Sequence, residues 1–144
     1  MNRFKPLLAL LPVFASASLL ASDAVVDTRC FSSPNGKINL ELKTYLDRDI
    51  GWVGGQVRYK QSEHYIPLVY QGSETINEVP DRPWEFKHTW LEIVDGKING
   101  RYEFHSQGAV MWNLHYIHSS GRSVDLSNQS YNLDDNGQCI WSSN

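Results

Sequence analysis

Residues 86–118 read FKHTWLEIVDGKINGRYEFHSQGAVMWNLHYIH, and this stretch decides the fold. Apolar and polar side chains alternate along it in three runs, the pattern of strands that are buried on one face. Asp95-Gly96 suits a two-residue hairpin turn, and Ser106-Gln107-Gly108 suits a three-residue turn with glycine at the left-handed position. The stretch therefore predicts three antiparallel strands, at residues 86–94, 97–105 and 109–118.

The two turns also predict a register. A two-residue turn pairs Val94 with Lys97, and strict alternation then puts Trp90, Arg101 and His115 on the outer face of the sheet. An exposed Trp–Arg pair suits recognition of a partner protein or a sugar. A solvated sheet face held by cross-strand pairs is the alternative interpretation.

The rest of the chain carries similar signals. A long irregular segment with Pro80 and Pro83 spans residues 71–85. The sequence predicts an all-β fold, a small antiparallel β-barrel or sandwich of about eight strands with largely meander connections. Further strand-like segments occupy residues 37–43, 52–60, 64–70, 123–126, 129–133 and 138–141.

Residues 1–21 have the pattern of a secretory signal peptide. Arg3 and Lys5 precede an apolar run at residues 7–14, and small residues at 15–17 fit a cleavage site, as does a second position near Ala21 or Ser22. The run is shorter than the roughly 20 apolar residues of a membrane span. We therefore predict one exported domain at residues 22–144, with no membrane span.

Two cysteines, Cys30 and Cys139, stand near the two ends of this domain. In an oxidising compartment such a pair favours one disulfide that clamps the chain ends together. A metal or redox pair is the alternative, but the chain has no CxxC spacing. Ser22 stands where a bacterial lipoprotein carries its lipidated cysteine. The predicted location is therefore periplasmic or secreted, without a lipid anchor.

The charge balance restricts the class of partner. The chain carries 13 Lys and Arg against 16 Asp and Glu, and two of the basic residues, Arg3 and Lys5, lie in the predicted leader. A nucleic-acid-binding protein has the opposite balance, so no nucleic-acid partner is predicted. An acidic exported domain suits a basic protein partner, such as a basic hydrolase. Solubility alone is the alternative.

No residue pattern predicts catalysis, a metal or a cofactor. His115 and His118 are three residues apart on a strand and point to opposite faces, and the other histidines lie on separate segments. Neither a G-x-S-x-G elbow nor a free cysteine is present to act as a nucleophile. The acidic run at residues 132–137 fits a turn better than a calcium loop. The sequence predicts a binding protein that is not an enzyme.

The segment at residues 71–85 is one candidate partner-binding surface. Long loops in small domains are often functional, and this one carries Glu74, Glu78, Asp81 and Trp84. A surface crossover between two halves of the sheet is the alternative. The turn at Ser120, Gly121 and Arg122 is the second candidate surface.

This second turn carries a family resemblance. In kind, the chain resembles the small exported all-β proteins that neutralise cell-wall-degrading enzymes, namely lysozyme inhibitors and periplasmic immunity proteins. Some of these inhibitors insert a Ser-Gly-x-x-Tyr loop into the enzyme's cleft, and Ser120-Gly121-Arg122-Ser123-Val124 shares its first two residues but not the tyrosine. The resemblance implies a soluble periplasmic binding protein that inhibits a cell-wall hydrolase.

Two other functions remain open from the sequence. The first is a carbohydrate or envelope-ligand binding module that uses exposed Trp52, Trp84 or Trp90. The second is a structural envelope protein. The sequence does not predict the oligomeric state.

Overall fold

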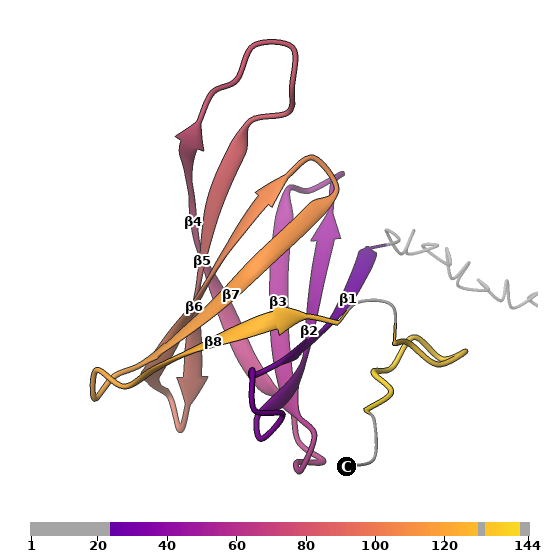
Figure 1. Cartoon of the computed structure of the whole chain (residues 1–144), viewed down its shortest axis with the longest axis vertical. Coiled ribbons are helices and arrows are strands. Elements are labelled where there is room, and N and C mark those ends of the chain that lie inside the picture. Colours follow the sequence, from indigo (N-terminus) through magenta and orange to yellow (C-terminus); the bar gives the residue numbers. More distant parts are fainter. Residues whose placement is uncertain (1–23, 130–131, 142–144) are drawn as a thin grey trace, which may run out of the picture.

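Alternating apolar and polar side chains fold the chain into eight antiparallel strands that close into a barrel (Figure 1). The structure, a computed structural model, describes residues 24–129 and 132–141; the predicted leader at residues 1–21 lies outside the described residues. Each strand pairs with the next along the chain, and β8 pairs with β1. The all-β meander is thus confirmed, and it is a barrel. The strands are β1 (Val25–Ser32), β2 (Asn39–Asp47), β3 (Trp52–Tyr59), β4 (Ile66–Asn77), β5 (Glu85–Val94), β6 (Lys97–Gln107), β7 (Val110–His118) and β8 (Ser123–Asn128).

The core lies inside the barrel, and every strand contributes to it. Inward-facing side chains alternate with outward-facing ones along each strand, as closure of a sheet requires. Each fully buried large apolar side chain contributes roughly 1.5–3 kcal/mol of transfer free energy. The buried core residues are Phe31, Leu40, Leu42, Val57, Leu68, Trp90, Tyr102, Phe104, Leu114 and Leu126.

Three segments differ from the prediction. The strand β1 was not predicted, and β4 continues to Asn77, so the irregular segment is shorter than residues 71–85. The predicted strand at residues 138–141 is absent, and Cys139 forms only an isolated bridge with Leu133. The prediction at residues 129–133 falls partly outside the described residues. Within the described ranges, no helix is long and apolar enough to span a membrane.

The predicted outward position of Trp90 is wrong. Val94 does pair with Lys97, but Asn99 is an extra residue that forms a bulge in β6 and shifts the register by one. Because side chains alternate with period two, this shift exchanges the two faces of β5 relative to β6. Trp90 consequently lies opposite Tyr102, inside the barrel, with 3% of its surface exposed.

The turn between β6 and β7 is also tighter than predicted. Gln107 pairs with Val110, so the turn has two residues and not three. Its glycine, Gly108, is left-handed as predicted, with φ at 60°. A second bulge places two residues of β7, Asn113 and Leu114, opposite one residue of β6. With these two bulges, Tyr102, Phe104 and Leu114 are buried in the core, whereas Trp112 of β7 lies opposite His105.

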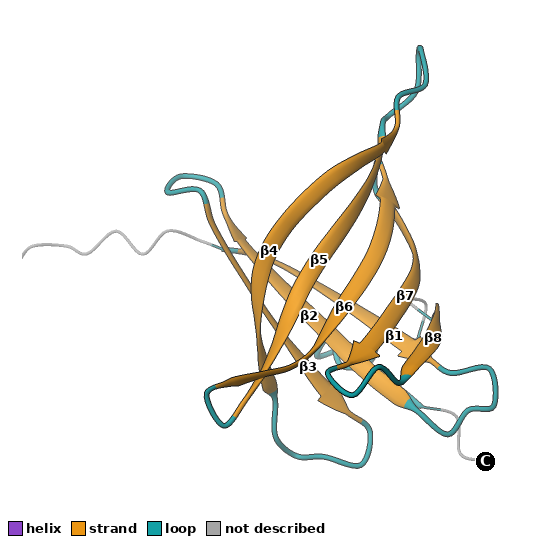
Figure 2. Ribbon diagram, turned by 90° about the vertical axis from the view of Figure 1, so that its left-hand side faces the viewer, coloured by secondary structure: helices purple, strands orange, loops and turns teal. Residues whose placement is uncertain are grey.

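The ladders that close the barrel differ in length. β1 and β8 share two register pairs and β3 and β4 share three, whereas β1 and β2 share eight. β4 and β5 continue beyond the other strands as a projecting hairpin (Figures 1 and 2). The β2–β3, β4–β5 and β6–β7 connections lie at one end of the barrel. We call it the open end, because a cavity opens there. The connections β1–β2, β3–β4, β5–β6 and β7–β8 lie at the other end.

A disulfide and a buried carboxylate hold the C-terminal segment, residues 132–141, against the outside of the barrel. The predicted Cys30–Cys139 bridge is confirmed, with the two Cα atoms 5.7 Å apart. Beside it, Glu41 accepts a hydrogen bond from the Cys139 backbone N–H at 2.9 Å and another from the Tyr65 hydroxyl at 2.7 Å. Arg58 adds an ion pair to Glu41 at 3.3 Å. The chain ends are thus clamped by covalent and polar contacts together.

Candidate functional site

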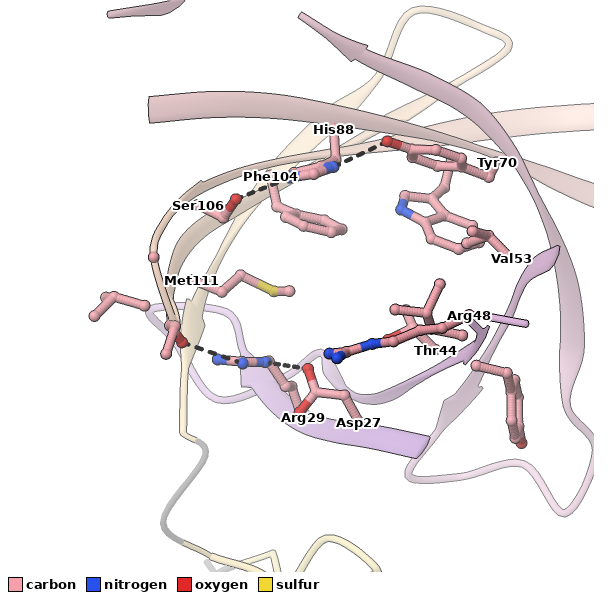
Figure 3. Close-up of a pocket in the computed structure, with 16 residues that line it drawn as sticks. Asp27, Arg29, Thr44, Arg48, Val53, Tyr70, His88, Phe104, Ser106 and Met111 are labelled. Atoms are coloured by element: carbon pink, nitrogen blue, oxygen red, sulfur yellow. Dashed lines mark hydrogen bonds and ion pairs between the residues drawn. The ribbon is translucent and has the colours of Figure 1, made fainter. Parts of the chain in front are cut away.

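A cavity of about 500 Å³ opens at the open end of the barrel (Figure 3). An eight-stranded barrel is just wide enough for side chains to fill it or for one small ligand to fit. Here side chains fill the barrel around Tyr102 and Leu114, which are fully buried. Nearer the open end, side chains leave space for the cavity. The residues around it are Asp27, Arg29, Thr44, Tyr45, Leu46, Arg48, Val53, Tyr70, His88, Trp90, Phe104, Ser106, Gly108, Ala109, Val110 and Met111.

One wall of the cavity is aromatic and comes from β4, β5 and β6. The Tyr70 and Trp90 rings have centroids 4.8 Å apart, and His88 stacks on Phe104 at 4.9 Å. Such aromatic pairs add about 0.5–1.5 kcal/mol each beyond their burial. Figure 3 shows Phe104 and Met111 on the same side of the cavity. This wall is a preformed, largely apolar surface of the cavity.

His88 is fixed within this wall by both ring nitrogens. Its Nδ1 lies 3.2 Å from the Tyr70 hydroxyl, and its Nε2 lies 2.8 Å from Ser106 Oγ. Burial lowers the pKa of His88 below its ordinary value, so the ring is neutral at pH 7. One ring nitrogen therefore donates and the other accepts.

The Ser106–His88 contact has the distance of a nucleophile and its general base. In acyl-transfer sites a third group, usually a carboxylate, orients the histidine and stabilises its charged form. Here Tyr70 occupies that place, and a neutral hydroxyl stabilises a charged imidazole much less than a carboxylate does. The arrangement suits a hydrogen-bonded wall of a binding site better than a catalytic pair.

The opposite wall is cationic and comes from β1, β2 and the β2–β3 connection. Arg29 donates from Nε to Asp27 at 2.7 Å and from one terminal nitrogen to the Ala109 carbonyl at 3.4 Å. Arg48 is exposed at the rim, and Figure 3 shows its side chain pointing into the cavity. Arg29 is thus partly neutralised by Asp27, and Arg48 adds a second positive charge.

The projecting hairpin holds one group of predicted site residues. Glu74 lies on β4 and forms an ion pair with Lys87 of β5. Glu78, Asp81 and Trp84 lie in the β4–β5 connection, where 48% of the Trp84 surface is exposed. This part of the prediction is brought together at one tip, away from the cavity.

The other predicted turn lies at the opposite end of the barrel. Ser120 and Gly121 are in the β7–β8 connection, and the Ser120 backbone N–H donates to His118 Nδ1 at 3.0 Å. Arg122 Nε donates to Ser120 Oγ at 3.3 Å. These bonds make a turn that is closed on itself. It cannot form one surface with the β4–β5 hairpin.

Arg101 and His115 stand on the outer face of the barrel as predicted, without Trp90. Arg101 forms an ion pair with Glu103 at 2.6 Å, and His115 contacts Asp125 at the same distance. These exposed pairs are typical of a solvated sheet face, and each contributes little to stability. Among the described residues, no group of three or more His, Cys, Asp and Glu side chains is placed to hold a metal ion.

The sequence analysis missed the cavity for two reasons: β1 was not predicted, and β5 was given the wrong face relative to β6. One signal was present: Asp27 and Arg29 alternate with Phe31 on one face of this strand, so charged residues share the inward face with a core aromatic. Inward-pointing charges at one end of a barrel strand indicate a lined cavity. Recognising it required the correct faces of β5 and β6.

Comparisons with protein-family models, with curated proteins and with solved structures gave no match.

Proposed function

We propose that this protein binds one small, largely apolar molecule in the open end of its barrel. The observation that carries the proposal is the cavity of about 500 Å³ between an aromatic wall and a polar wall. Ligand sites have volumes of roughly 300–1,000 Å³ and combine an apolar lining with a few placed polar groups. This is the envelope-ligand alternative of the sequence analysis, with Trp90 acting from inside the barrel.

The indole of Trp90 supports the proposal independently. Its N–H is buried and has no hydrogen-bond acceptor among the described residues. A buried donor without an acceptor costs about 1–3 kcal/mol. Because Trp90 lines the cavity, a ligand acceptor that reaches this N–H would remove that cost.

A neutral environment-sensitive dye, N-phenyl-1-naphthylamine, tests the proposal. We expect saturable fluorescence enhancement with one site per chain. The variant Val53→Phe enlarges a cavity-lining side chain and should weaken binding at least tenfold. Val69→Phe is the matched control, because Val69 neighbours Tyr70 on β4 but is 52% exposed. Absence of saturable binding, or equal binding by the two variants, would contradict the proposal.

A second candidate function uses the projecting hairpin. It is the sequence-based prediction of a periplasmic or secreted inhibitor of a cell-wall hydrolase. The supporting observation is the exposure of Trp84 (48%) and Ile76 (46%) on a hairpin that extends beyond the barrel, beside Glu78 and Asp81. Exposed aromatic residues with acidic neighbours suit contact with a basic protein. The disulfide supports an exported protein, since such bonds persist in oxidising compartments.

Inhibition of cell-wall lysis by a basic lysozyme tests this second candidate. The wild-type protein should slow lysis at a stoichiometric ratio. Charge reversal at Glu74, Glu78 and Asp81 should abolish the effect if the hairpin acts, and substitution at Ser120 and Gly121 should do so if the opposite turn acts. Unchanged lysis in the presence of excess wild-type protein would remove lysozyme as the partner.

A further inference from the structure

The cavity has two walls of different chemistry, and they face each other. Figure 3 shows Tyr70, His88 and Phe104 on one side and Asp27, Arg29 and Arg48 on the other. The first group belongs to β4, β5 and β6, and the second to β1 and the β2–β3 connection. A molecule that fills this space contacts an apolar surface and a charged surface at the same time.

The charged wall carries an excess of positive charge. Arg29 is matched by Asp27 at 2.7 Å, and its remaining bond goes to a backbone carbonyl. For Arg48, no hydrogen bond or ion pair is present within the described ranges. Among the described residues around the cavity, Asp27 carries the sole carboxylate. The wall thus holds two guanidinium groups and one carboxylate.

We propose that the ligand is an organic anion with a single acid group and an apolar body, and that Arg48 together with Arg29 binds the acid group. This inference rests on the proposed function of the cavity as a ligand site. The guanidinium group has a planar array of donors that matches the two oxygens of a carboxylate. The apolar body lies against Trp90, Phe104 and Met111. A cation is disfavoured by the same two arginines.

The geometry favours an amphipathic anion over a small inorganic one. Most of the lining residues, among them Leu46 and Val53, have aliphatic or aromatic side chains that an ion such as phosphate leaves uncovered. The position of Arg48 at the rim places the acid group toward solvent, where its desolvation cost is low. The apolar body then enters first, and the head group is held at the open end.

Three ligands with the same alkyl chain and different head groups separate the contribution of the head group to affinity from that of the apolar body. Decanoate, 1-decanol and decyltrimethylammonium carry an anionic, a neutral and a cationic head. At pH 8, where decanoate is ionised and His88 is neutral, calorimetric titration should show decanoate binding at least tenfold more tightly than decanol. The cationic ligand should bind most weakly.

The variant Arg48→Gln should remove the preference by lowering decanoate affinity about 10- to 100-fold, the range for one hydrogen-bonded charge pair, with decanol affinity unchanged. Arg101→Gln is the matched control, because Arg101 lies on the outer face with Glu103. Thermal unfolding verifies that both variants fold. Equal affinity for decanoate and decanol, or a preference that survives Arg48→Gln, overturns the inference while the proposed function stands. If neither these ligands nor the neutral dye binds, the proposed function itself fails, and this inference with it.

Discussion

Glu92 lies inside the barrel, and its hydrogen-bond partners in the described structure are neutral donors. It accepts bonds from the hydroxyl groups of Tyr102 at 2.8 Å and Tyr116 at 2.7 Å, and from the Asn99 amide at 2.6 Å. Since Tyr102 has one hydroxyl hydrogen, which it gives to Glu92, its 2.8 Å contact with Tyr59 is a bond that Tyr59 donates. Burial raises the pKa of Tyr102 far above its ordinary value, which keeps the hydroxyl protonated. The network supplies the donors that a buried carboxyl group requires.

The substitution Tyr102→Phe should destabilise the protein by about 2–4 kcal/mol, because it removes a donor from Glu92 and the acceptor of Tyr59 at a fully buried site. Urea unfolding measures the change. The control is Tyr45→Phe, which loses only the 2.8 Å bond to Gln56 and should cost less than about 1 kcal/mol. A similar decrease in the free energy of unfolding in both variants would contradict a large contribution of the Glu92 network to stability.

Glu41 differs from Glu92 in having cationic partners. Burial alone would raise its pKa, but the Cys139 backbone N–H, the Tyr65 hydroxyl, Lys43 and Arg58 outweigh that effect and lower the pKa below its ordinary value. A carboxylate with a lowered pKa in the folded state contributes stability above its unfolded pKa. That contribution is lost as the pH falls through the folded pKa.

The variant Glu41→Gln should therefore be less stable at pH 7, by about 1–3 kcal/mol, and its free energy of unfolding should fall less steeply below pH 5. Urea titrations from pH 7 to pH 3 provide the measurement. Glu103→Gln, which alters the ion pair with Arg101 and a charge interaction with Lys87 at the surface, is the control. Parallel pH profiles for wild type and Glu41→Gln would contradict the role assigned to Glu41.

At the scale of the strands, glycines let large aromatic rings lie against the barrel wall. A Cβ atom at Gly55 of β3 would come within 2.6 Å of the Trp90 ring, which is fixed in the core. A Cβ atom at the adjacent glycine, Gly54, would meet the ring of Trp52, but that ring is 52% exposed and has solvent beside it. The same local crowding has different consequences inside and outside the barrel.

Gly55→Ala should thus destabilise the protein by about 1–3 kcal/mol through overpacking. It should also change the dye affinity, because Trp90 forms part of the cavity wall. Gly54→Ala should stay within about 0.5 kcal/mol of wild type and leave dye binding unaltered. Urea unfolding and dye titration of the pair test this; a neutral Gly55→Ala would mean that Trp90 has room to shift.

At the scale of the whole molecule, closure depends on contacts between distant segments. The β1–β8 ladder is short. The disulfide joins Cys30, which lies in β1 close to this ladder, to Cys139 in the C-terminal segment. Cys30 and Cys139 are 109 residues apart, so the bond constrains most of the unfolded domain. In the chain-entropy description, a loop of this length is worth up to roughly 4–5 kcal/mol.

Reduction of the disulfide, or the double variant Cys30→Ser and Cys139→Ser, should lower the free energy of unfolding by as much as that amount. The measurement is urea unfolding with and without reductant. A changed dependence on urea concentration would indicate an altered unfolded state. An unchanged midpoint would mean that the β1–β8 ladder and the Glu41 contacts suffice to close the barrel.

Local signals in the sequence were enough for the class of fold. Alternation and turn chemistry act between neighbouring residues, so they predicted seven of the eight strands, the largely meander order and the turn at Asp95-Gly96, although β4 extends to Asn77, beyond the predicted end at residue 70. The positions of the two cysteines near the ends of the predicted domain were enough to predict the disulfide. These features do not depend on the exact register between paired strands.

Only the tertiary structure decided which side chains face the cavity. One extra residue, Asn99, turned Trp90 from the predicted outer face to the inside, since a single-residue shift exchanges the faces of a strand. The cavity unites Arg29 of β1 with His88 of β5 and Met111 of β7, residues that no local pattern relates. Barrel closure brings them together, because it is a long-range pairing that depends on the twist and register of all the strands at once.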